Sequence, residues 1–290
     1  MRAFITLLLL AGCANPITNR VFLADLEFID ALPTRERHHP PSAIQNAPQG
    51  DAIVLPHAQS AANDLQRITD AIINVSESLA ATMPQERSVT ARKWDPVAVV
   101  SDNISLFWAK GQMVRSGDNT DITWTIEASD SSSGTWQLLG SGRHAPEGYG
   151  DFTWYLDVYT LLTDTEAEGG LKVTYDDFGL DGEQTATYEI GDALTGGEGQ
   201  VWTTGADVLL GWNGHFQITN DGAWWPGWAH VVQMPEGGRA MGMLYTSNID
   251  EISFKECWTS DGFNQWISGD SGIPSQGSEA DCAVEDLFED

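Results

Sequence analysis

The chain has 290 residues and a formal net charge of −28, and that charge is unevenly placed. Residues 1–94 hold 8 Lys and Arg against 9 Asp and Glu, whereas residues 95–290 hold 6 against 33. A domain this acidic repels phosphate backbones, so the composition excludes a nucleic-acid partner. It is also repelled by anionic lipid head groups, so any membrane contact has to come from another source.

The first thirteen residues have the pattern of an export signal. Arg2 supplies a positive charge, residues 3–11 form an apolar run, and the small residue Gly12 precedes Cys13. The run is too short to cross a bilayer, which takes about 20 residues. An ordinary signal peptide with a chance cysteine would share most of these features.

The sequence Leu10-Ala11-Gly12-Cys13 resembles the lipobox of bacterial lipoproteins. The resemblance implies that residues 1–12 are a signal peptide that is removed and that Cys13 is lipidated. Several acyl chains together anchor a protein firmly to a membrane. Because Ala14 rather than Asp follows the cysteine, the resemblance also implies sorting to the outer membrane of a bacterial cell envelope, on its periplasmic or surface face.

Two further cysteines, Cys257 and Cys282, are expected to form a disulfide. Exported chains meet an oxidising compartment, where cysteines usually pair. The bond would tie an acidic C-terminal tail, residues 273–290, to the last strand. The alternative is a metal site, but two thiols without a nearby histidine pair make a poor zinc set. We therefore expect no metal and no cofactor.

Two helices are predicted before the strands begin. Residues 13–56 are expected to be a tether with one short helix, whose apolar residues are Phe22, Leu23, Leu26, Ile29 and Leu32. Residues 57–94 hold an amphipathic helix, predicted over 58–83, and a linker. Its apolar stripe consists of Leu65, Ile68, Ile72, Val75 and Leu79. Such a stripe covers the open face of a sheet or, alternatively, binds a partner helix.

From residue 95 to 272 the apolar period changes to two, which predicts an antiparallel β domain of about ten strands. The predicted inward sets are Ile122, Trp124 and Ile126; Phe152, Trp154, Leu156 and Val158; Leu171, Val173 and Tyr175; Ala186, Tyr188 and Ile190; Met241, Met243 and Tyr245; and Ile252 and Phe254. Short turns separate these runs. The fold class is therefore mainly β: a curved antiparallel sheet or a partly open or closed β-barrel, with one long N-terminal helix packed on it.

Motifs for catalysis are missing from the sequence. It contains no Gly-x-Ser-x-Gly elbow, no His-Glu-x-x-His and no phosphate-binding loop. The acidic turn at 176–183 lacks the alternating ligand order of a helix–loop–helix calcium site, so we interpret it as a hairpin turn. His144, His215 and His230 are isolated in sequence. An enzyme is therefore the less favoured interpretation, although a catalytic set could still assemble in space.

Tryptophan is the most unusual feature, with 12 in the chain and three between Trp224 and Trp228. Two adjacent indoles on an extended strand point to opposite faces, and Pro226 indicates a sheet edge, a bulge or a bend. Indoles stack on sugars and line apolar pockets, but they also fill the cores of large sheets. The predicted ligand-binding residues are Trp212, Trp224, Trp225 and Trp228.

The mature part resembles uncharacterised envelope lipoproteins, in its order of lipobox, helices and Trp-rich sheet with a late Cys257-Trp258 pair. It also resembles, in architecture only, the half-open barrels of lipoprotein-carrier proteins. The leading hypothesis is a non-enzymatic envelope lipoprotein that binds an apolar or amphipathic ligand such as a lipid, or that has a structural role. A carbohydrate-binding lipoprotein with a glycan ligand, and a hydrolase that uses carboxylates, are the alternatives.

Replacing Cys13 by serine should block acylation and release the protein from membranes, because serine lacks the thiol to which the first acyl group is attached. Incorporation of radiolabelled fatty acid into the protein measures this directly. Equal labelling of the wild type and of Cys13→Ser would show that the anchor is not at this residue.

Overall fold

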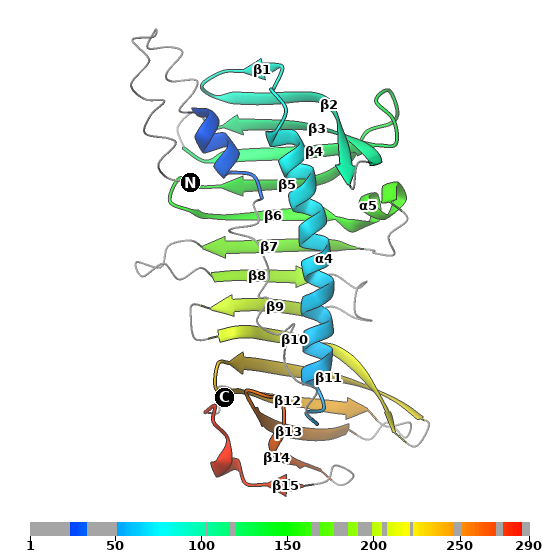
Figure 1. Ribbon diagram of the computed structural model, residues 1–290, viewed down its shortest axis with the longest axis vertical. Coiled ribbons are helices and arrows are strands. Elements are labelled where there is room, and N and C mark those ends of the chain that lie inside the picture. Colours follow the sequence, from blue (N-terminus) through cyan, green and yellow to red (C-terminus); the bar gives the residue numbers. More distant parts are fainter. Residues whose placement is uncertain are drawn as a thin grey trace.

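The computed structural model describes residues 24–33, 51–101, 104–116, 120–163, 169–176, 185–190, 199–204, 208–220, 223–245, 251–270 and 275–285. Within them, one antiparallel sheet of fifteen strands follows the order of the chain from β1 to β15 (Figure 1). The fold class is therefore the predicted one, mainly β with a long helix on the sheet. The described ladder is open rather than a closed barrel, because β1 and β15 each pair with one neighbour only.

The strands are connected as a simple meander, so each strand pairs with the one before it and the one after it. Their bounds are β1 Glu86–Arg87, β2 Ala91–Ser101, β3 Ile104–Arg115, β4 Ile122–Ser129, β5 Gln137–His144, β6 Tyr149–Tyr155, β7 Gly170–Asp176, β8 Thr185–Ile190, β9 Gly199–Thr204, β10 Val208–Asn220, β11 Ala223–Met234, β12 Gly237–Tyr245, β13 Glu251–Thr259, β14 Asn264–Gly269 and β15 Gln276–Gly277.

Helical segments lie between and before these strands. Residues 24–30 form the short predicted helix, α4 spans Leu55–Ala80, α5 spans Leu156–Thr163, and η1 spans Glu279–Asp281. The prediction of the long helix is confirmed to within three residues at each end. Leu156 and Val158 were predicted to continue the strand before them, but they belong to α5, where Tyr159 packs edge-on against Phe107 of β3.

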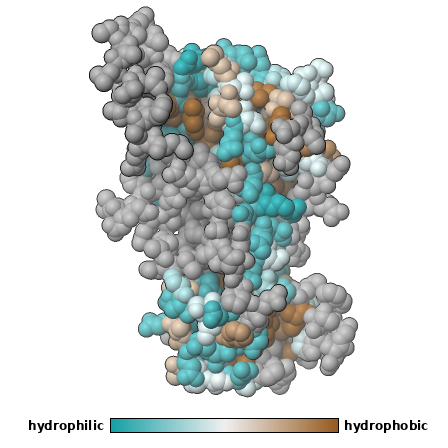
Figure 2. All heavy atoms as spheres, in the orientation of Figure 1, coloured by the Kyte–Doolittle hydropathy of each residue, from teal (hydrophilic) through white to brown (hydrophobic). Residues whose placement is uncertain are grey.

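Helix α4 crosses the strands and covers the middle of one face of the sheet (Figure 1). Its predicted stripe is buried, and Leu65, Ile72, Val75 and Leu79 are among its least exposed residues. The opposite side of the helix is hydrophilic and forms a teal band down the molecule in Figure 2. We call the sheet face under α4 the helix face and the other one the outer face.

Bulky indoles on the helix face lie against glycines of the neighbouring strand. The cross-strand pairs are Trp94 with Gly111, Trp124 with Gly142, Trp154 with Gly140, and Trp258 with Gly238. A methyl group on Gly142 would lie 2.6 Å from the indole of Trp124 and from Cβ of Phe152. Glycine thus lets a large ring lie flat, which keeps the layer below α4 thin enough for one helix to cover it.

Both ends of α4 are fastened to the sheet by polar contacts. At its C-terminal end, the indole of Trp94 in β2 donates a 2.8 Å hydrogen bond to the carbonyl of Thr82. At its N-terminal end, the backbone N–H groups of Ile53 and Val54 donate to the carboxyl oxygens of Glu256 in β13, at 2.8 and 2.9 Å. Val54 is the N-cap residue, so Glu256 satisfies one donor that the start of a helix leaves without an intrahelical partner, and it also binds the N–H group of the residue before it.

The length of α4 requires the sheet to bend. Val54 and Leu79 are about 38 Å apart along a helix, and Leu79 would contact a methyl group on Gly111 of β3 at 3.1 Å. Ten strand spacings, from β3 to β13, measure about 48 Å along a sheet. Because the fastened helix is shorter than the sheet beneath it, the helix face is the concave side.

Replacing Gly142 by alanine should lower the free energy of unfolding by about 1–3 kcal/mol, because the methyl group overpacks the layer between Trp124 and Phe152. Gly170→Ala in β7 is the matched control, since its methyl group would meet nothing closer than 3.7 Å. Urea unfolding measures both. Equal losses in the two variants would contradict the packing role of Gly142.

The buried carboxyl of Glu256 should make stability depend on pH. Burial raises its pKa from 4.5 to about 7, against the opposing effect of the N–H groups of Ile53 and Val54. The folded state therefore binds the proton more tightly than the unfolded state. This stability is fully present below pH 4.5 and is lost as the pH rises through 7.

Between pH 5 and pH 8 the wild type should lose up to about 3 kcal/mol more stability than Glu256→Gln, which cannot titrate. Comparing the two proteins cancels the repulsion among the many other acids, which also grows with pH. Urea titrations at several pH values give both curves, and parallel curves would contradict this assignment.

Candidate functional site

A groove with a volume of about 540 Å³ lies on the outer face, over strands β11 to β14. This is within the usual size range of small-molecule sites. The groove is lined by Trp228, Met241, Gly242, Met243, Ser253, Phe254, Lys255, Trp266, Ser268, Gly269, Asp270 and Glu279. Its floor is a set of alternate residues from four neighbouring strands, and its wall comes from the C-terminal segment.

The register of the strands places the floor residues in rows. Trp228 is paired with Met243, and Met243 with Ser253. In the next row Met241 is paired with Lys255, and Lys255 with Ser268. Cys257 and Trp266 form a third row. Since residues two apart on a strand share a face, all of these side chains belong to the outer face.

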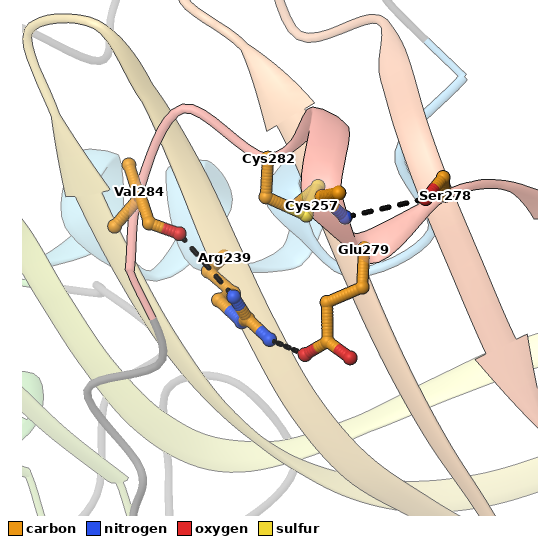
Figure 3. The surroundings of a disulfide bond; sticks show 7 residues. Arg239, Cys257, Ser278, Glu279, Cys282 and Val284 are labelled. Carbon is orange, nitrogen blue, oxygen red and sulfur yellow. Dashed lines mark hydrogen bonds and ion pairs between the residues drawn. A yellow bond between two sulfur atoms is a disulfide. The ribbon is translucent and has the colours of Figure 1, made fainter.

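The wall is fixed by a disulfide between Cys257 and Cys282, with an S–S distance of 2.04 Å (Figure 3). The predicted pairing is therefore present. Cys257 comes from β13, and Cys282 directly follows η1. The bond holds the segment of residues 275–285 against the outer face beside the groove.

Arg239 of β12 provides a second fastening for the same segment. Its side chain is almost fully buried, forms an ion pair with Glu279 and donates a 3.3 Å hydrogen bond to the carbonyl of Val284 (Figure 3). The guanidinium also lies 5.5 Å from the centre of the Trp266 ring. Arg239 therefore connects the C-terminal segment to the floor and holds Glu279 at the groove wall.

The lining of the groove combines apolar and charged side chains. Two indoles and two thioethers give an apolar floor, and methionine adapts its shape to varied apolar partners. Lys255 brings a cation to the floor. Asp270 accepts a 3.1 Å hydrogen bond from the backbone N–H of Ser253, and Glu279 is paired with Arg239. Both lining carboxylates thus have structural partners.

The sequence prediction for β12 is wrong about which face is buried. Met241 and Met243 were predicted to face inward, but they are half-buried on the outer face and line the groove. The inward residues are the small Gly238, Ala240 and Gly242, followed by Leu244 near the end of the strand. The rings of β13 occupy the space above them, since a methyl group on Gly242 would lie 2.9 Å from the ring of Phe254.

The four tryptophans predicted to bind a ligand are not brought together. Trp228 lines the groove, whereas Trp212 is 1% exposed on the helix face and Trp225 packs against the same core. The side chain of Trp224 is outside the described residues. Trp266, which sequence analysis did not single out, is the second indole of the groove; the outward period of β14 could have found it.

Pro226 occupies a local edge, as its missing N–H requires. It is paired with Gln217 of β10, but the pairing of β11 with β12 begins only at Gly227. The first residues of β11 therefore extend beyond β12. The strand needs no bend to accommodate the proline.

The histidines of the β domain do not form one cluster: His144 belongs to β5, whereas His215 and His230 are diagonal neighbours on the outer face of β10 and β11. His144 is buried and lies 2.9 Å from the hydroxyl of Tyr175, and His215 is exposed. Burial lowers the pKa of His230, which is next to the groove in the row of Met241. Among the described residues, no group of three His, Cys, Asp or Glu could hold a metal ion.

Several sequence predictions concern residues outside the described ranges. Cys13 and the tether up to residue 23 are among them, as is the acidic turn from residue 177 onward. In the part of the chain that is described, no helix is both long enough and apolar enough to cross a bilayer.

This chain has no detected relative among known proteins. No family model, no curated protein and no solved structure matches this chain.

Removing the disulfide with Cys257→Ala/Cys282→Ala should destabilise the protein by about 3 kcal/mol in the chain-entropy model. Amide hydrogen exchange should rise in residues 275–285, while β3 to β7 keep their protection in native conditions. Mass spectrometry of unreduced wild-type peptides checks the bond itself. Two thiols free to be alkylated in protein that has not been exposed to a reductant would contradict it.

Proposed function

We propose that this chain is a lipid-anchored protein of a bacterial cell envelope that binds an amphipathic ligand in the outer-face groove, without catalysing a reaction. The observation that carries the proposal is the lining of the groove. Trp228, Met241, Met243 and Trp266 make it apolar, and Lys255, Asp270 and Glu279 add charges of both signs. Such a combination suits a ligand with an apolar body and a polar head.

The dimensions of the groove favour an elongated ligand. Trp228 and Trp266 come from strands three spacings apart, which is about 14 Å across the sheet. Their rows are also about 13 Å apart along the strands, because Ser253 and Cys257 are separated by four residues. An acyl chain or a similar extended molecule can contact both indoles, whereas one compact ring contacts only one of them.

The anchor is supported by the sequence at the N-terminus. The lipobox-like Leu10-Ala11-Gly12-Cys13 places an acylated cysteine before the tether. Anionic lipids repel the acidic β domain, so the acyl chains supply the membrane attachment. The resemblance at residue 14 favours the outer membrane.

A glycan is the second candidate ligand, because indoles also stack on sugar rings. Trp228 and Trp266 share one groove with Ser253, Ser268 and Asp270, which could bind hydroxyl groups. The spacing of the indoles would require an oligosaccharide of several units. Nothing among the described residues favours the hydrolase hypothesis, because Asp270 and Glu279 are each held by a structural contact.

Trp228→Ala should weaken the binding of dansyl-undecanoic acid, a fluorescent fatty acid, by about 5- to 100-fold, because the truncation removes about 1–3 kcal/mol of apolar contact. The matched control is Trp136→Ala, which removes another half-buried indole, located just before β5 under Lys110. Fluorescence titration gives the Kd values, and thermal melts show whether each variant is folded.

Competition identifies the class of ligand. Palmitate should displace the probe, whereas a mixture of peptidoglycan and glucan oligosaccharides should not. Displacement by the oligosaccharides alone would favour the glycan hypothesis. Equal affinities of the wild type and Trp228→Ala for the probe would contradict the groove as the binding site.

A further inference from the structure

Helix 24–30 is fastened to the β1–β3 end of the sheet by three arginines. Asp25 pairs with Arg87 and Arg92, and Glu27 pairs with Arg115. Burial of Asp25 opposes ionisation, but the hydrogen bonds from these two arginines lower its pKa below the ordinary value. Asp25 and Glu27 lie on either side of the buried face of the helix, so their ion pairs hold it in one orientation.

Phe28 completes this attachment from the buried side of the helix. Its ring lies 4.5 Å from the guanidinium of Arg92 and 5.5 Å from that of Arg115. Ala24, Ala31 and Leu32 are buried around it. These buried side chains are sufficient to pack the short helix against the sheet. The apolar side chains on its outward side are therefore not needed for that packing.

Three large apolar side chains at this end remain exposed. Leu26 is 48% exposed, Ile29 is 42% exposed and Met83, just after α4, is 76% exposed. The sequence assigned Leu26 and Ile29 to the short helix without assigning them to a face, and both lie on its outward side. Ile29 and Met83 line one cleft of about 220 Å³ together with Ala80, Pro84 and Trp94. Brown atoms gather at this upper end of the molecule in Figure 2.

We propose that Leu26, Ile29 and Met83, here named the anchor-side patch, contact the lipid bilayer in which the acyl chains of Cys13 are inserted. The inference rests on the anchor in the proposed function, not on the groove. Cys13 and Ala24 are only eleven positions apart in the sequence, with ten residues between them. Even a fully extended chain of that length reaches about 38 Å, so the bilayer lies within reach of the patch.

The distribution of charge favours the same end of the molecule for contact with the bilayer. The described residues of helix 24–30 and strands β1 to β3 hold five Lys and Arg against five Asp and Glu, whereas the whole chain has a net charge of −28. Anionic head groups repel the acidic remainder and leave this neutral end, where Arg87 and Lys93 are exposed, as the side that can approach. An interfacial contact of apolar side chains next to arginines is a common way for a protein to lie on a membrane.

This orientation places the groove far from the bilayer. The sheet advances by one strand at each turn of the meander, and β2 and β12 are ten spacings apart. That distance is roughly 48 Å along the sheet. The binding groove would therefore face the space beyond the membrane that holds the anchor, where it can meet a ligand delivered from another surface.

The test uses full-length acylated protein in vesicles of phosphatidylcholine and phosphatidylglycerol. A nitrobenzoxadiazole label is attached at Met83→Cys, and nitroxide lipids quench it only if it enters the interface. Leu161→Cys on α5 is the matched control, because Leu161 is apolar and 72% exposed. Phe263→Cys, in the turn after β13, marks the far end of the sheet.

Quenching about threefold stronger at Met83 than at both controls is expected, because interfacial side chains lie about 5–10 Å deep, close to the nitroxide. Equal quenching at the three positions, or the strongest quenching at Phe263, overturns the proposal. The mass of the N-terminal peptide from the same sample shows whether Cys13 is acylated, which tests the anchor separately.

If that peptide is not acylated, the membrane contact is tested by whether the protein floats with the vesicles in a density gradient. A chain that floats with the vesicles and loses flotation in Met83→Asp supports the patch as a membrane contact without the anchor. A chain that does not float overturns the proposal. The binding of fatty acid in the groove is unaffected by either result.

Discussion

One helix covers the buried face of a fifteen-stranded sheet, and its fixed length limits how that sheet can be shaped. Trp94 holds one end and Glu256 holds the other, more than 150 residues later in the chain. Because the strands between these points run farther than the helix, the sheet has to curve. Flat indoles over glycines keep the layer between helix and sheet thin along the way.

Among the described residues, no long helix covers the outer face of the sheet as α4 covers the helix face (Figure 1). An antiparallel sheet tolerates this when its outer residues are polar, as they are along β4, where Thr123, Thr125 and Glu127 alternate with buried residues. Strands β11 to β14 depart from that pattern, since their outer face carries Trp228, Met241, Met243 and Trp266. The disulfide and Arg239 hold the C-terminal segment beside this apolar area and turn it into a groove.

Local patterns predicted the elements well, and long-range contacts account for the errors. The apolar stripe of α4 and the alternation of β4 and β7 were sufficient to predict which side of each element is buried. Each pattern depends only on residues that are close together in the sequence. Met241 and Met243 were assigned to the wrong face because the rings of Trp258 and Phe254 fill the space above Gly238 and Gly242. Trp266 and the role of Glu256 depend on segments that meet only after folding.

Photo-crosslinking with a diazirine fatty acid tests the central claim, that the ligand binds on the outer face and not between helix and sheet. The folded protein is irradiated with the probe, and labelled peptides are identified by mass spectrometry. The account predicts labels on outward residues of β11 to β14, such as Trp228, Met241 and Met243, and their loss when palmitate competes. Labels concentrated on α4, on residues such as Leu65 and Ile72, would contradict it.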